Sequence, residues 1–93
     1  MTPEEQAELL RSIYSSLRKR LYRKEFRTRF ALLTAKNKKY YCEKQDCLYA
    51  VTNIIENAII ADDFSRALKY LVLFKAEIDT ITLKMEKDCE PYI

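Results

Sequence analysis

The segment FSRALKYLVLFKAEIDTITLKM, residues 64–85, decides the fold because its apolar residues recur at alternating spacings of three and four. This is the coiled-coil-like repeat of a helix that packs along one seam of a helical bundle. Leu68 and Val72 widen the stripe, as in helices that contact more than one neighbour. We predict a helix that begins at Phe64 and ends near Asp88. Its seam comprises Phe64, Ala67, Leu71, Phe74, Ile78, Ile81 and Met85.

A second helix comes just before this one and is joined to it by two acidic residues. Asp62 and Asp63 are expected to end one helix and begin the next, because aspartate favours turns and N-terminal caps. We therefore predict a helix from about residue 41 or 45 to 61, which forms an αα-hairpin with the following helix. The expected apolar stripe of the earlier helix comprises Cys47, Leu48, Val51, Ile54, Ile55, Ala58, Ile59 and Ala61.

The N-terminal part of the chain carries a strong helix-start signal. Thr2 can accept a hydrogen bond from the Glu5 amide, and Pro3 occupies the first helical position, where its missing amide hydrogen costs little. The segment is therefore predicted to be helical from about residue 3. Its first apolar stripe, at helical spacing, comprises Leu10, Ile13, Tyr14, Leu17 and Leu21.

A second stripe follows the first along the same segment but points more than a quarter turn away from it. Because no glycine or proline marks a break, we predict one continuous helix from about residue 3 to about residue 35, with an interruption at residues 37–39. The alternative is a break near residues 20–25 that folds the second stripe onto the chain's own bundle. The second stripe comprises Tyr22, Phe26, Phe30 and Leu33.

Together these segments predict an all-α fold, a three-helix bundle in which a long basic N-terminal helix packs on an αα-hairpin. Short connections make sequential helices antiparallel neighbours. A chain of 93 residues can build one hydrophobic core, so residues 1–93 are expected to form a single helical domain. The predicted core includes Leu10, Leu17, Val51, Ile55, Ala58, Phe64, Leu71, Phe74 and Ile78.

The hairpin region, residues 58–71, resembles the helical hairpins of tetratricopeptide repeats and of microtubule-interacting-and-trafficking domains. The likeness lies in an aromatic residue after an acidic turn, followed by Ala-Leu, which are Phe64, Ala67 and Leu68 in this chain. The long basic segment before the hairpin departs from both families. The resemblance therefore implies a helical hairpin and assigns no family.

The residue types that most catalytic and cofactor sites require are absent or too few. Without histidine the chain lacks the usual general base and the commonest zinc ligand, and without glycine it lacks phosphate-binding loops. Cys42, Cys47 and Cys89 are too few for a four-ligand zinc site. We therefore expect no catalytic residues, no cofactor, no metal and no small-molecule substrate. Carboxylate- or lysine-based catalysis is the chemistry that composition leaves open.

Cysteine usage and the N-terminal sequence favour a reducing compartment. An odd number of cysteines without a secretory pattern is typical of intracellular proteins. The longest apolar run, residues 70–74, is too short to span a bilayer. We expect an intracellular protein, cytoplasmic or nuclear, without a transmembrane segment.

Positive charge is concentrated in residues 11–39. This segment holds eleven basic residues and one acidic residue, whereas residues 1–10 carry a net charge of −3 and residues 40–93 a net charge of −4. Such a segment attracts phosphates, acidic protein surfaces or anionic membranes. The alternative is a solvated basic face that only balances the acidic residues elsewhere in the chain.

Aromatic residues are interspersed among these cations, which favours a partner-binding surface. Aromatic and arginine side chains are enriched at interface hot spots, and the second stripe would be exposed on a lone three-helix bundle. We predict a non-catalytic protein–protein interaction or oligomerisation module, a subunit or adaptor of a larger assembly. It would bind an acidic protein surface or a second copy of itself, homodimerisation being the simplest case, and the alternative function is nucleic-acid binding through residues 11–39. The predicted partner-binding residues are Arg18, Tyr22, Arg23, Phe26, Arg27 and Phe30.

Overall fold

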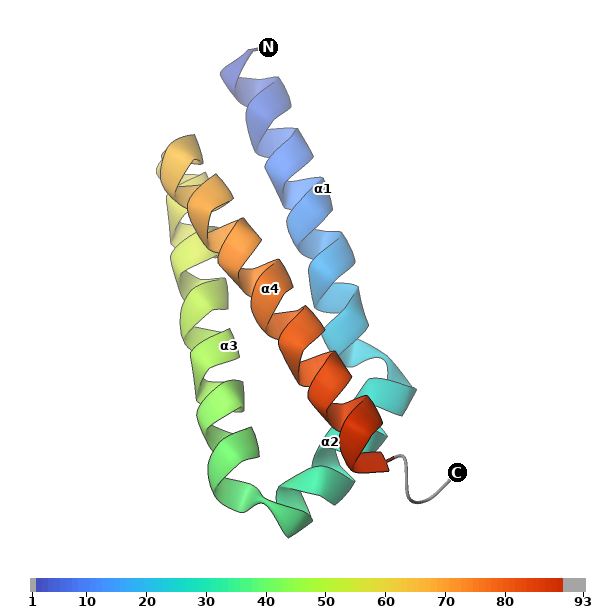
Figure 1. Cartoon of the computed structure of the whole chain (residues 1–93). Coiled ribbons are helices and arrows are strands. Elements are labelled where there is room, and N and C mark those ends of the chain that lie inside the picture. The colour runs from blue at the N-terminus through green and yellow to red at the C-terminus, as the bar shows by residue number, and fades with distance from the viewer. Residues whose placement is uncertain (1, 90–93) are drawn as a thin grey trace.

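The computed structural model describes residues 2–89, and these form helices joined by short connections (Figure 1). The all-α prediction is confirmed, but the described residues form four helices where three were predicted. The predicted hairpin is present, and the long N-terminal helix is replaced by two helices. The four are α1 (Pro3–Tyr22), α2 (Lys24–Lys36), α3 (Lys38–Ile60) and α4 (Phe64–Cys89).

The prediction of one continuous helix from residue 3 to residue 35 is wrong, because the helix is interrupted at Arg23. Arg23 has an extended backbone, with φ −62° and ψ 136°, between the end of α1 and the start of α2. The two apolar stripes explain the break, since one straight helix cannot turn both of them toward the same core. After the extended residue, Leu33 is buried and Phe26 and Phe30 pack against the core.

Three long helices run side by side, and α2 lies across one end of them (Figure 1). α1 and α4 run in the same direction, while α3 runs in the opposite one. α4 packs most extensively on α3 and next on α1, whereas α1 and α3 make few contacts with each other. α1 and α3 are therefore held together mainly through α4 and α2.

α4 supplies the centre of the core. Its predicted seam is confirmed, since every seam residue from Ala67 to Met85 is buried and Phe64 is partly buried. Of the nine predicted core residues, Val51 and Phe64 are only partly buried and the other seven are buried. The buried stripe of α3 differs from the predicted one, because Cys47 and Ala61 are exposed. The buried residues of α3 are Tyr41, Leu48, Ile55, Ala58 and Ile59.

Tyr41 ties the start of α3 to the end of α4. Its side chain is fully buried, and its hydroxyl donates a hydrogen bond to Asp88 Oδ2 at 2.8 Å. Lys84 Nζ lies 3.3 Å from the other carboxylate oxygen. The hydrogen bond from Tyr41, supported by Lys84, lowers the pKa of Asp88 because both favour the charged form. The contact fixes these two helix ends beside α2.

The turn between α3 and α4 ends one helix and caps the next, as predicted. Asp62 has a left-handed backbone with φ 56°. Its amide donates to the Ile59 carbonyl at 3.1 Å, and the Asp63 amide donates to the Ala58 carbonyl at 2.9 Å. This is the Schellman arrangement, in which glycine is the usual left-handed residue. Asp63 then caps α4, because its Oδ1 accepts a hydrogen bond from the Arg66 amide at 3.3 Å.

Asp62→Gly is expected to raise the free energy of unfolding by about 0.5 kcal/mol, because relief of the Cβ strain at positive φ outweighs glycine's greater entropy when unfolded. Asp63→Ala is the matched control, since it removes the same charge one residue away. It should lower the free energy of unfolding by about 1 kcal/mol, because α4 loses its cap. Urea-induced unfolding measures both changes, and effects of the same sign would contradict this turn geometry.

Candidate binding groove

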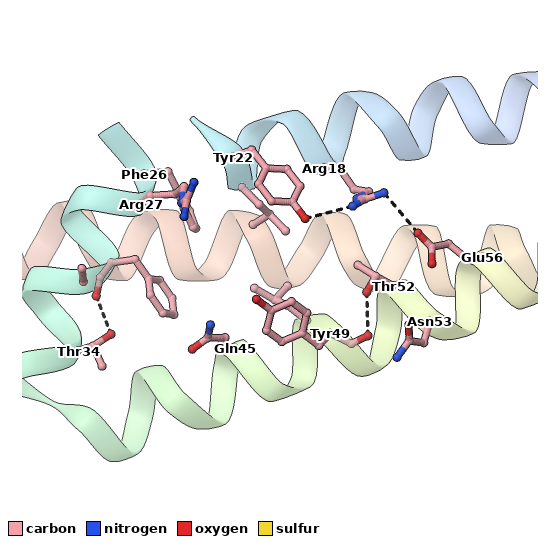
Figure 2. Close-up of a pocket in the computed structure, with 14 residues that line it drawn as sticks. Arg18, Tyr22, Phe26, Arg27, Thr34, Gln45, Tyr49, Thr52, Asn53 and Glu56 are labelled. Carbon is pink, nitrogen blue, oxygen red and sulfur yellow. Dashed lines mark hydrogen bonds and ion pairs between the residues drawn. The ribbon is translucent and has the colours of Figure 1, made fainter. Parts of the chain in front are cut away.

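A groove opens between α1 and α2 on one side and α3 on the other (Figure 2). Its volume is about 660 Å³. Tyr22, at the end of α1, and Tyr49, on α3, point into the groove from opposite sides. Both residues are more than half exposed, at 58% and 60%. The groove therefore presents aromatic rings on a surface that the chain itself leaves open.

The α3 wall of the groove is a regular helical stripe. Its residues recur at spacings of three and four from residue 45 to residue 56, a length of about 16 Å at 1.5 Å per residue. Leu48 is its apolar member and Tyr49 its aromatic one, while the other four carry amide, hydroxyl or carboxylate groups. The stripe comprises Gln45, Leu48, Tyr49, Thr52, Asn53 and Glu56.

Phe26 and Phe30 supply the apolar part of the opposite wall. Their rings stack with centroids 5.9 Å apart, and Phe30 meets the buried Tyr41 ring edge-on at 5.2 Å. Both phenylalanines are partly buried against the core. They therefore anchor α2 to the bundle and, with their remaining surface, give the groove its apolar character.

A hydrogen-bond network closes one end of the groove. Glu56 Oε1 accepts a hydrogen bond from the Tyr14 hydroxyl at 2.7 Å and lies 3.4 Å from Arg18 Nη1. Burial, reinforced by the bond to Glu56, raises the pKa of Tyr14 well above its ordinary value. The Cζ atom of Arg18 lies 5.4 Å from the ring centroids of both Tyr14 and Tyr22. It also donates to the Tyr22 hydroxyl at 3.1 Å, which favours the guanidinium and raises its pKa.

Arg27 differs from Arg18 because it forms no ion pair with any residue from 2 to 89. It is exposed and borders both the groove and a second, more open depression of about 560 Å³ on α2. Tyr22 borders both hollows as well. An exposed guanidinium without an ion pair, in a hollow that also holds an aromatic side chain, can bind a carboxylate through two hydrogen bonds.

The structure brings five of the six predicted partner-binding residues together at the groove. Arg23 is the exception, since it forms the exposed break between α1 and α2 and does not line the groove. The sequence prediction missed the α3 wall, including Tyr49 and Glu56. The signal was present as helical spacing from residue 45 to residue 56, on a face of the helix that adjoins its buried stripe and shares Leu48 with it. That these residues contact a partner remains a prediction.

Residues 2–88 contain no metal-binding cluster, and residues 2–89 contain no membrane-spanning helix. No three cysteine, aspartate or glutamate side chains from residue 2 to residue 88 are grouped so that they could hold a metal ion. Cys42 and Cys47 have free thiols. None of the helices from residue 2 to residue 89 combines the length and apolar character needed to cross a bilayer.

No protein-family model, curated protein or solved structure matches this chain. The chemistry of the groove follows from its own side chains. It offers aromatic rings for burial, the Arg27 guanidinium for an anion, and the amide groups of Gln45 and Asn53 for hydrogen bonds. These groups suit the binding of a surface that is apolar in the middle and acidic at one side.

Proposed function

We propose that the chain is a non-catalytic interaction module that binds an acidic segment of a partner protein in the groove. The observation that carries the proposal is Arg27, which has no ion pair among residues 2–89 and lines the same two hollows as Tyr22. Arginine and tyrosine are among the residues that contribute most binding energy at interfaces. Such a subunit or adaptor needs no catalytic group of its own.

The distribution of ion pairs supports an acidic partner. Arg18 and Arg20 from the basic segment pair with residues of α3 and α4. Most other cations of the segment, Arg23, Lys24 and Arg27 among them, form no ion pair within residues 2–89. All three lie around the break between α1 and α2, where Arg27 lines the groove and Lys24 lines the second depression. Complementary charge there would steer an acidic partner and set its orientation.

A protein segment suits this surface better than a nucleic-acid backbone does. Phosphate binding relies on many cations along a solvated surface. Here Arg27 is the one cation of the groove without an ion pair among residues 2–89; it lies among aromatic, apolar and uncharged polar side chains, and Glu56 occupies the other end. Nevertheless Tyr22 and Tyr49 present rings on which bases can stack. Nucleic-acid binding is therefore the competing outcome that the experiment must detect.

Selection from a display library of random peptides of about 18 residues, a length of about 27 Å when helical, tests the proposal. We expect enriched peptides to combine acidic and apolar residues. Arg27→Glu should weaken their binding about tenfold or more, because it replaces an attraction with a repulsion at the groove. Arg29→Glu is the matched control, since Arg29 is also exposed on α2 but lines neither hollow. Fluorescence polarisation gives the dissociation constants.

Three results would contradict the proposal. Equal losses for Arg27→Glu and Arg29→Glu would show a diffuse charge effect without a binding site. Tight binding of generic RNA or DNA that falls steeply between about 50 and 200 mM salt would favour the nucleic-acid alternative. A dimer in solution that Tyr22→Ala/Tyr49→Ala converts to a monomer would identify a second copy of the chain as the occupant.

A further inference from the structure

We infer that the partner segment binds in the groove as an amphipathic α-helix whose acidic end lies at Arg27. The inference rests on the proposed function and specifies its partner. It follows from the spacing of the groove walls, from the hydrogen bonding that an occupant requires, and from the positions of the charges along the groove.

Both walls of the groove present side chains at helical spacing. The α3 stripe rises for three turns from Gln45 to Glu56. Across the groove, Phe26 and Phe30 are four residues apart on α2, and Thr34 follows four residues later. Rows of this kind form ridges, and the ridges of another helix can pack into the space between them. Because α1 and α3 make few contacts with each other, a helix lying between them would gain two neighbours at once.

Backbone hydrogen bonding favours a helix over an extended segment. Residues 2–89 contain no β-strand, so the protein has no sheet edge there to pair with an extended peptide. An extended segment in the apolar part of the groove would leave its own amides and carbonyls without partners, which is costly. A helix satisfies its backbone internally and needs only one apolar face to bind in this way.

The charges along the groove define the direction of the occupant. Arg27, together with the nearby unpaired Lys24, is positive on the α2 side. Glu56 is at the far end of the α3 stripe, where Arg18 already pairs with it. Acidic residues of the occupant are therefore favoured beside Arg27, whose charge is unpaired, over the end beside Glu56, where Arg18 and Glu56 balance each other.

Proline and alanine scanning of the selected peptides tests the helix. We expect proline at a central position to weaken binding about tenfold or more, because it breaks a helix, while proline at the first position has little effect. Sensitive positions should recur at spacings of three and four. Tyr49→Ala should weaken binding, whereas Leu83→Ala, at a similarly exposed residue outside the groove, should not.

A charge exchange tests the direction. Lysine in place of the acidic residues at one end of the peptide should weaken binding to the natural chain and restore binding to Arg27→Glu. Some peptides could depend on the groove yet tolerate proline at a central position, or show sensitive positions at every second residue. Such peptides would contradict a helical occupant but agree with the proposed function. If lysine at the other end of the peptide restores binding to Arg27→Glu, or if lysine at neither end does, the acidic end does not lie at Arg27. A selection that yields no groove-dependent peptide would instead overturn the proposed function and the helix together.

Discussion

Replacing Phe74 with alanine is expected to lower the free energy of unfolding by about 3–5 kcal/mol. Phe74 is fully buried in the seam of α4, and its ring centroid lies 6.0 Å from that of Tyr14 on α1. The substitution removes the ring from a seam held rigid by the neighbouring helices and leaves a cavity. Since domains of this size are stable by only about 5–15 kcal/mol, a large part of the total would be lost.

Val72→Ala is the matched control for this change. Val72 lies on the same helix, two residues from Phe74, and is 63% exposed. Its truncation should change the free energy of unfolding by about 0.5 kcal/mol or less. Urea-induced unfolding followed by circular dichroism compares the two variants directly. Similar losses for both would show that the buried face of α4 is assigned incorrectly.

The buried face of α4 could be predicted from the sequence because one uninterrupted helix carries it. In such a helix the spacing of apolar residues alone determines which side faces the core. Ala67 and Met85 lie at the two ends of the confirmed buried seam, and no break comes between them. The Asp62-Asp63 turn was also predictable, since local side-chain chemistry decides where these helices end and begin.

The break at Arg23 could not be predicted from local sequence rules. Neither glycine nor proline marks it, and no side chain caps the start of α2 at this residue. The break arises from tertiary packing, because Leu17 in the first stripe and Leu33 in the second are both buried in one core. The phase change between the stripes was visible in the sequence, but its structural consequence depended on which helices they contact.

The groove was predictable only on one side. Residue types identified Tyr22 and Arg27, because aromatic and arginine side chains alternate there in a basic segment. The residue types around Tyr49 on α3 do not indicate a binding surface in the same way. Their exposure depends on how closely α1 and α3 approach, and that spacing is set by the way both helices pack on α4.

Leu33→Ala is expected to release α2 from the bundle and to lower the free energy of unfolding by about 2–4 kcal/mol. Leu33 is the one buried residue of α2 and is only 3% exposed. With 13 residues, α2 is too short to remain helical without packing, because isolated helices of about 12–15 residues are marginal in water. Phe26 and Phe30, which are partly buried, cannot replace the lost anchor fully.

Leu32→Ala is the control, since the adjacent Leu32 is 64% exposed and its truncation should change the free energy of unfolding by about 0.5 kcal/mol or less. Amide hydrogen exchange distinguishes local release of α2 from global weakening. In Leu33→Ala, we expect amides of α2 to exchange much faster while those of α4 keep most of their protection. Equal protection of α2 in both variants would show that Leu33 does not hold the helix. Release of α2 would also remove one wall of the groove, so the peptides selected on the natural chain should no longer bind.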